Sequence, residues 1–181
     1  MPNSSNMRTG GQILVDQLRI HNVDTAFCVP GESYLAALDA LHDVPEIRLL
    51  TCRHEANAAN MAEAYGKLTG QPGICFVTRG PGACHAVVGL HTAFQDSSPL
   101  ILFVGQVGRE MMEREAFQEM DFRRFFGQVS KWSAEIQDPG RIPELVSRAF
   151  HVATSGRPGP VMLSLPEDML TELSGVGDGR T

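Results

Sequence analysis

The chain alternates short apolar runs of strand length with segments whose apolar residues recur at helical spacing, and this alternation constrains its fold most strongly. Strands are expected at 25–29, 47–52, 73–78, 99–105, 131–135 and 161–165, and helices at 11–21, 34–41, 55–69, 84–96 and 143–153. The run 73–78 is apolar through its middle, as in a strand covered on both faces. We therefore predict a doubly wound α/β fold with a mostly parallel six-stranded sheet and helices on both faces.

Length and composition limit the number of domains and the kinds of partner. The 181 residues are enough for one domain with a substantial core. We expect this domain at 10–170, after a disordered N-terminus at 1–9 and before the start of an interdomain linker at 171–181. The net charge of −6 argues against nucleic acid as a partner, and no apolar stretch approaches membrane-spanning length. The four cysteines lack Cys-x-x-Cys spacing, so we expect reduced thiols and a cytoplasmic protein.

A glutamate stands where an expected strand turns into a helix. Glu55 follows the apolar run 47–52 and begins an alanine-rich segment, which Gly70 closes as an expected C-cap. In an open α/β sheet, ligands bind along the edge outside the carboxyl ends of the strands. An isolated glutamate at such a place most often only complements the helix dipole, so the neighbouring residues must decide whether Glu55 is catalytic.

Two glycine-containing turns fall at the same edge of the expected sheet. They are Pro30-Gly31-Glu32 after the first strand and Gly80-Pro81-Gly82 after the third. Glycines let the backbone approach a ligand, and the N-terminus of a following helix offers free amide donors. Turns of this composition are often purely structural, and phosphate binding is the other role that the residues alone suggest.

These motifs, in this order, resemble the pyrimidine-binding domain of thiamine diphosphate enzymes, in particular that of the acetolactate synthase group. The resemblance rests on Arg53-His54-Glu55 with the small-residue helix behind it, and on the turn Gly80-Pro81-Gly82-Ala83. It implies that Glu55 accepts a hydrogen bond from a ring nitrogen of the cofactor's aminopyrimidine and so activates thiamine diphosphate. It further implies that the cofactor is contacted by Pro30, Gly31, Gly80, Pro81, Gly82 and His85.

Two positions depart from the acetolactate synthase pattern. His85 stands where that group usually has asparagine, and its other interpretation is an ordinary histidine near the start of a helix. Glu32 stands where the group has a second glycine. An acid at this place resembles the related 2-oxo-acid decarboxylases, although their pair of adjacent histidines is absent from the sequence. Glu32 is therefore either a substrate-site candidate or a solvated turn residue.

The stretch 106–126 is long and irregular for a connection in a compact domain, and such loops are usually functional. Within it, Ala116-Phe117-Gln118-Glu119 resembles the carboligase form of this loop, in which the phenylalanine and the glutamine line the substrate site. Phe117 and Gln118 are therefore substrate-site candidates. The other interpretation of Phe117 is a surface anchor of the loop.

The chain itself is not predicted to bind a metal ion. Gly177-Asp178-Gly179 matches the start of the magnesium motif of thiamine diphosphate enzymes, but that motif needs a preceding strand and a later asparagine. The resemblance implies that Mg²⁺ is held by a diphosphate-binding domain that this chain does not contain. It also implies that this domain comes from another subunit of a homo-oligomer.

The favoured function is that of the N-terminal, cofactor-activating domain of a thiamine diphosphate-dependent carboligase or decarboxylase of 2-oxo acids. The chain alone is then expected to be inactive. One alternative is a stand-alone pyrimidine-domain subunit of a split 2-oxo-acid decarboxylase, against which the linker-like tail speaks mildly. Another is a non-catalytic binding or regulatory module, with which the presence of Glu55 fits poorly.

Overall fold

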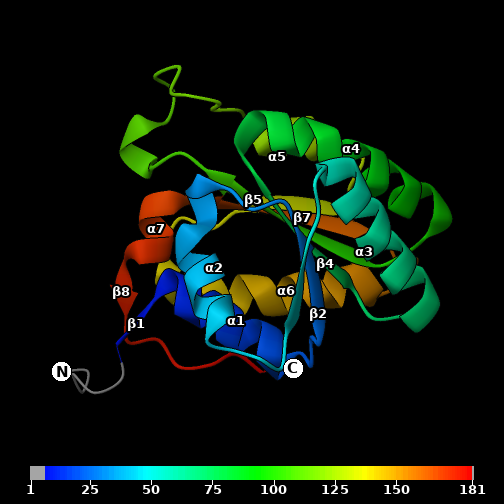
Figure 1. The fold of residues 1–181 in the computed structure, drawn as a ribbon, viewed down its shortest axis with the longest axis horizontal. Coiled ribbons are helices and arrows are strands. Elements are labelled where there is room, and N and C mark those ends of the chain that lie inside the picture. Colours follow the sequence, from blue (N-terminus) through cyan, green and yellow to red (C-terminus); the bar gives the residue numbers. More distant parts are fainter. Residues whose placement is uncertain (1–6, 181) are drawn as a thin grey trace.

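The computed structural model describes residues 7–180, which form a central sheet with helices on both of its faces (Figure 1). The sheet has six strands in the order β3-β2-β4-β5-β7-β6, and every neighbouring pair is parallel. These strands are β2 (Thr25–Cys28), β3 (Arg48–Thr51), β4 (Gly73–Thr78), β5 (Leu100–Gln106), β6 (Trp132–Glu135) and β7 (Pro160–Pro166). The predicted α/β class and six-stranded sheet are confirmed.

The helices cover the sheet in two layers. They are α1 (Gly10–Ile20), α2 (Leu35–His42), α3 (Glu55–Thr69), α4 (Arg79–Asp96), α5 (Phe122–Phe126), α6 (Ile142–Thr154) and α7 (Glu167–Thr171). One layer contains α3, α4 and α5, and the other contains α1, α2, α6 and α7. None of the helices described here has the length and apolar character that a membrane span requires.

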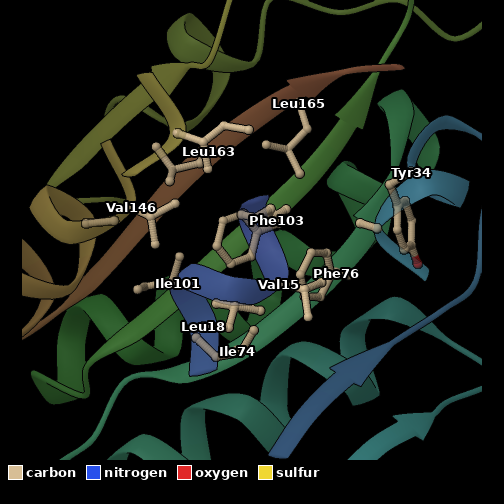
Figure 2. Packing of buried hydrophobic residues seen from close by; sticks show 14 of the residues in the cluster. Val15, Leu18, Tyr34, Ile74, Phe76, Ile101, Phe103, Val146, Leu163 and Leu165 are labelled. Carbon is tan, nitrogen blue, oxygen red and sulfur yellow. The ribbon is translucent and has the colours of Figure 1, made fainter. Parts of the chain in front are cut away.

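Side chains of the central strands alternate between the two helix layers. Ile74 and Phe76 of β4 pack with Ile101 and Phe103 of β5 in the layer of α1, α2 and α6 (Figure 2). The rings of Phe76 and Phe103 are stacked, with their centroids 4.7 Å apart. Cys75, between Ile74 and Phe76, belongs to the core of the opposite layer. Because both faces are buried, these strands are apolar throughout, which explains why the sequence identified them well.

The strand order creates a switch point between β2 and β4. The chain passes from β2 outward to β3 and then returns to the other side of β2 as β4. Open parallel sheets bind ligands in the crevice outside the carboxyl ends of the strands at such a reversal. The three segments predicted to contact the cofactor follow β2, β3 and β4, so the fold places all of them at this edge.

Helix α4 begins earlier than predicted. The sequence predicts a turn at Gly80-Pro81-Gly82 and a helix from residue 84, but the helix starts at Arg79 and the three residues form its first turn. Proline is tolerated there because the first amide groups of a helix have no intrahelical acceptor. The reversal from strand to helix is made at Arg79, which has a positive φ of 40°. Such a conformation is uncommon outside glycine and is often found at functional sites.

The two ends of the described chain pair with each other. Strand β1 (Arg8–Thr9) runs antiparallel to β8 (Leu173–Ser174). The predicted disorder at 1–9 is therefore wrong for Arg8 and Thr9, while 1–6 lies outside the described residues. Strands of two residues carry no periodic signal, so the sequence could not show this pairing.

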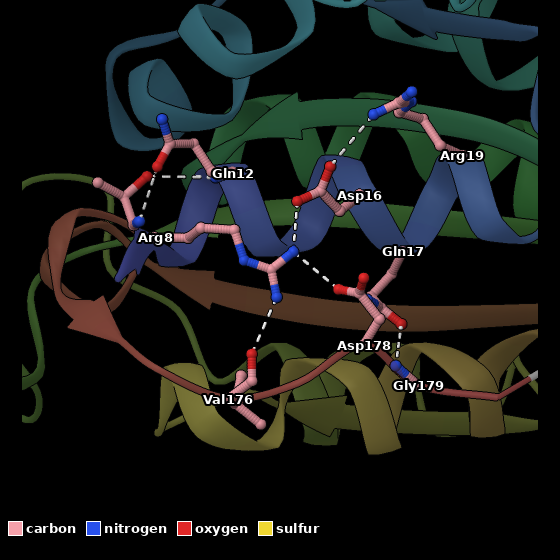
Figure 3. Close-up of polar contacts among 9 residues, drawn as sticks. Arg8, Gln12, Asp16, Gln17, Arg19, Val176, Asp178 and Gly179 are labelled. Atoms are coloured by element: carbon pink, nitrogen blue, oxygen red, sulfur yellow. Dashed lines mark hydrogen bonds and ion pairs between the residues drawn. The ribbon is translucent and has the colours of Figure 1, made fainter. Parts of the chain in front are cut away.

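The C-terminal segment also lies against α1 through polar contacts. Arg8 donates hydrogen bonds to Asp16 of α1, to Asp178 and to the carbonyl of Val176, and Figure 3 shows how this guanidinium joins the two ends. Asp178 is thus occupied in an ion pair. The exclusion of Asp178 as a metal ligand and the assignment of 171–181 to an interdomain linker both stay predictions.

His21, just beyond α1, is expected to make the folded protein less stable in mild acid. Its ring is stacked on Phe150 at 4.0 Å, and its Nε2 is buried without a hydrogen-bond partner in the part of the chain that is described. Burial lowers the pKa of His21. The unfolded chain therefore binds this proton first, and the free energy of unfolding should fall as the pH drops below about 6.5. Urea unfolding at several pH values should show this fall, and His21→Phe, which keeps a stacked ring, should reduce it.

Candidate active site

The fold brings Glu55 and His85 into contact at the switch-point edge. Glu55 is the first residue of α3, and His85 lies in the second turn of α4. Nδ1 of His85 is 2.8 Å from Oε2 of Glu55, and because an ionised carboxylate only accepts hydrogen bonds, His85 is the donor. The Glu55 side chain is 14% exposed and that of His85 52% exposed. The carboxylate is therefore partly buried, which would suit the predicted cofactor role.

Small residues allow the two helices to approach closely enough for this contact. Ala58, Ala59 and Ala62 of α3 are fully buried, in the core that α3 shares with α4. A Cβ atom added to Gly89 of α4 would lie only 2.5 Å from the Cβ of Ala59. Ala59 lies four residues after Glu55 on α3, and Gly89 lies four residues after His85 on α4. Each spacing is about one helical turn. The close crossing thus fixes the separation of the two polar side chains.

Gly82 lies beside the second oxygen of the Glu55 carboxylate. A Cβ atom at Gly82 would be 3.4 Å from Oε1 of Glu55. Among the described residues, no hydrogen bond reaches this Oε1, whereas Oε2 is held by His85. The carboxylate therefore keeps one free acceptor oxygen next to a residue without a side chain. This arrangement fits a flat heterocycle that donates an N–H group.

His54 completes a cluster of polar side chains. It is the N-cap of α3, and its Nδ1 accepts a hydrogen bond from the backbone amide of Ala56 at 3.1 Å. Its ring is stacked on that of His85 with centroids 4.6 Å apart. The possible metal-ligand atoms of His54, Glu55 and His85 lie within 4.8 Å of one another, which is close enough to hold a metal ion. The His54 lone pair at Nδ1 is already used in the cap, however, so Nε2 carries a proton, and we retain the prediction that the chain binds no metal.

The turn after β2 packs on the end of β4. A Cβ atom at Gly31 would lie 2.3 Å from the Cβ of Thr78, and the hydroxyl groups of Ser33 and Thr78 are 2.6 Å apart. Only glycine fits at position 31. Glu32 begins a short 3-10 turn and is exposed, and no hydrogen bond joins it to another candidate residue within residues 7–180. The structure thus places Gly31 at the switch point, and among the described residues no hydrogen bond joins Glu32 to Glu55.

The long loop is attached to the first turn of α4 by main-chain groups. The amide of Gly80 donates to the carbonyl of Gln118 at 2.9 Å. The guanidinium of Arg79 donates to the carbonyl of Phe117 at 3.4 Å and to Glu167 at 2.7 Å. Phe117 is 74% exposed, so packing of its ring against the protein does not anchor the loop. The predicted substrate loop and the predicted cofactor turn therefore meet at Gly80.

Two further residues of this edge, Arg79 and His54, contribute contacts that the sequence motifs do not predict. Arg79 holds the loop through its guanidinium, and its side chain is only 11% exposed. A charged residue directly after a buried strand was a visible signal for such a role. The sequence predicts no contact for His54, because its bond to the Ala56 amide depends on the turn geometry and its stacking on His85 depends on the position of α4.

The fold is that of a parallel α/β domain, and its candidate residues gather at the switch-point edge. The family model described as thiamine pyrophosphate enzyme, N-terminal TPP binding domain, matches residues 8–125. The chain therefore belongs to that family.

Curated relatives specify the group within the family. The chain is 39% identical over 161 residues to the mitochondrial acetolactate synthase catalytic subunit of Saccharomyces cerevisiae, covering 89% of this chain and 23% of the yeast protein. It is 41% identical over 164 residues to acetolactate synthase of Arthrospira platensis, covering 89% and 28%. It is 38% identical over 171 residues to the acetolactate synthase large subunit of Lactococcus lactis, covering 94% and 30%. The chain is thus an acetolactate synthase-like N-terminal domain, and it spans about a quarter of the length of these relatives.

Proposed function

We propose that this chain activates thiamine diphosphate as one half of the active site of an enzyme that acts on 2-oxo acids. The observation that carries the proposal is Glu55, a partly buried carboxylate with Oε2 held by His85 and Oε1 free beside Gly82. Family membership and similarity to acetolactate synthases support the same reading.

Glu55 would hold the aminopyrimidine end of the cofactor by accepting a hydrogen bond at Oε1. Pro30, Gly31, Gly80, Pro81 and Gly82 would line its surroundings, because they follow β2 and β4 at the switch point. When bound, thiamine diphosphate supplies an electron sink for making and breaking bonds next to a carbonyl group. The part of Glu55 is to keep or release a proton at one carboxylate oxygen, which is general acid–base catalysis.

We further propose that Phe117 and Gln118 contact the 2-oxo acid, with Glu32 as a third candidate on the turn after β2. The loop carrying Phe117 and Gln118 is held at Gly80, which is two residues from Gly82 beside Glu55. Phe117 is 74% exposed, so its ring is available for contact with a substrate or with a partner domain.

Phe117→Ala tests the substrate role of the loop. Because this ring is largely exposed, the free energy of unfolding should change by less than about 0.5 kcal/mol. In the complete enzyme, the same substitution should raise KM for the 2-oxo acid or change the product. Phe125→Ala, which removes a phenylalanine of α5 that is 36% exposed, is the control that should change neither KM nor the product. Unchanged kinetics for Phe117→Ala would remove the residue from the substrate site.

The proposed active site needs a second domain. We propose that a diphosphate-binding domain holding Mg²⁺, from another subunit of a homo-oligomer, completes it. Support comes from apolar side chains exposed on the helices next to Glu55: Met61 and Leu68 of α3 and Val88 of α4, of which Leu68 is 86% exposed. Where such side chains form a contiguous patch, that patch marks a contact with another domain or subunit.

An assay of the complete protein that carries this domain tests the proposed function. With thiamine diphosphate and Mg²⁺, it should consume simple 2-oxo acids, and analysis of carbon dioxide and of the products should separate decarboxylation from carboligation. Turnover that is the same without thiamine diphosphate would refute the proposal.

A further inference from the structure

The hydrogen bond between His85 and Glu55 decides which carboxylate oxygen is available. A glutamate in the first turn of a helix normally samples several rotamers in solvent. Here Nδ1 of His85 lies 2.8 Å from Oε2, so this oxygen already accepts one hydrogen bond, while Oε1 beside Gly82 accepts none from the described residues. His85 therefore selects both the orientation of Glu55 and the oxygen that it presents.

The ring of His85 is itself held in place. It is stacked on the ring of His54 with an interplanar angle of 27°, and His54 is fixed because its Nδ1 caps α3 at the Ala56 amide. The cap keeps the proton of His54 on Nε2, since a proton on Nδ1 would oppose the Ala56 N–H. The chain of contacts thus runs from the backbone of α3 through His54 and His85 to Glu55.

We propose that His85 is a positioning residue: its Nδ1–H group fixes the Glu55 carboxylate so that Oε1 faces the cofactor's aminopyrimidine. This inference rests on the proposed function of Glu55 and adds the element that orients it. His85 acts through Glu55 and does not touch the reacting atoms. This role requires only one feature of His85, an N–H donor at the position of Nδ1. Neither a charge on the ring nor its second nitrogen is needed.

Two substitutions of His85, to asparagine and to alanine, separate the N–H donor from the rest of the ring. In His85→Asn, the side-chain NH₂ is attached at the same distance from the backbone as Nδ1, so a donor to Glu55 is kept while the rest of the ring is lost. In His85→Ala, no donor remains. His91→Ala removes another exposed histidine of α4 and serves as the matched control.

The first experiment uses the 181-residue chain and needs no activity. Nitrogen-15 NMR of the histidine rings, at a pH well above the ordinary imidazole pKa of about 6.5, reports which nitrogen carries the proton. We expect His85 to carry it on Nδ1 and His54 on Nε2. Glu55→Ala should release the His85 proton to Nε2. A wild-type His85 that is protonated on Nε2, or one that does not respond to Glu55→Ala, would overturn the proposal.

The second experiment uses the complete enzyme. A hydrogen bond to a charged group contributes enough that His85→Ala should lower kcat by about tenfold or more. His85→Asn should restore most of this loss, and His91→Ala should behave as wild type. Equal losses for the asparagine and alanine variants would refute a role of the N–H donor. If Glu55→Gln left turnover intact, the proposed function itself would fail, whereas loss with Glu55→Gln and none with His85→Ala would refute only the present inference.

Discussion

Glu55→Gln should lower cofactor-dependent turnover of the complete enzyme by about 100-fold or more, which is the range for removal of a general acid–base group. Glutamine keeps the size and an acceptor oxygen of the side chain, but it cannot take up a proton. The Glu55 side chain is only 14% exposed and its Oε2 is held by His85, so the variant should occupy the same place in the folded protein. Steady-state kinetics with a 2-oxo acid measure the loss, and circular dichroism checks the fold.

Glu144→Gln is the matched control for this experiment. Glu144 also lies in the first turn of a helix, α6, but α6 covers the opposite face of the sheet. If Glu55 contributed only to the helix dipole, Glu55→Gln and Glu144→Gln would behave alike. Both would have small effects on stability and none on turnover. Retention of full turnover by Glu55→Gln would contradict the catalytic role of Glu55.

Gly89→Val should destabilise the domain and weaken its active site at once. The first side-chain atom at this position would already lie 2.5 Å from Cβ of Ala59 and 2.6 Å from its carbonyl carbon, so α3 and α4 must move apart. Overpacking of this kind costs about 1–3 kcal/mol. In a domain of this size, each kcal/mol lowers Tm by about 2–4 °C. Thermal unfolding of the 181-residue chain measures the effect.

The same substitution should lengthen the contact between Glu55 and His85, which lies one turn away along both helices. Loss of turnover in the complete enzyme, together with release of the His85 proton to Nε2, would show the coupling. Gly177→Ala is the control, because a Cβ atom there meets nothing within 4 Å. An unchanged Tm for Gly89→Val would mean that the two helices do not cross as closely as described.

The sequence identified the sheet well because of where its strands lie. β4 at Gly73–Thr78 has the predicted bounds, since burial on both faces makes the whole run apolar. The first turn of α4 was mistaken for a loop, because glycine and proline signal turns by composition, and the positive φ at Arg79 has no signature in sequence. The pairing of β1 with β8 was missed, because short polar segments are held by contacts to distant residues.

The candidate site was predictable in part. The position of Glu55 could be predicted from a strand that turns into a helix, and the family resemblance of the chain implied that Glu55 contacts a cofactor. The contact with His85 was not predictable, since these residues are 30 positions apart and meet only because Ala59 and Gly89 let two helices approach. The attachment of the loop at Gly80 likewise depends on main-chain geometry.

If Glu55 activates bound thiamine diphosphate, it should speed the exchange of the acidic thiazolium proton for deuterium in the complete enzyme. Rapid quenching and proton NMR give the rate with cofactor bound and no substrate present. We predict exchange at least about 100-fold slower in Glu55→Gln than in the wild type, with the cofactor bound in both. Equal exchange rates in the two proteins would contradict the assignment of Glu55 as the activating residue.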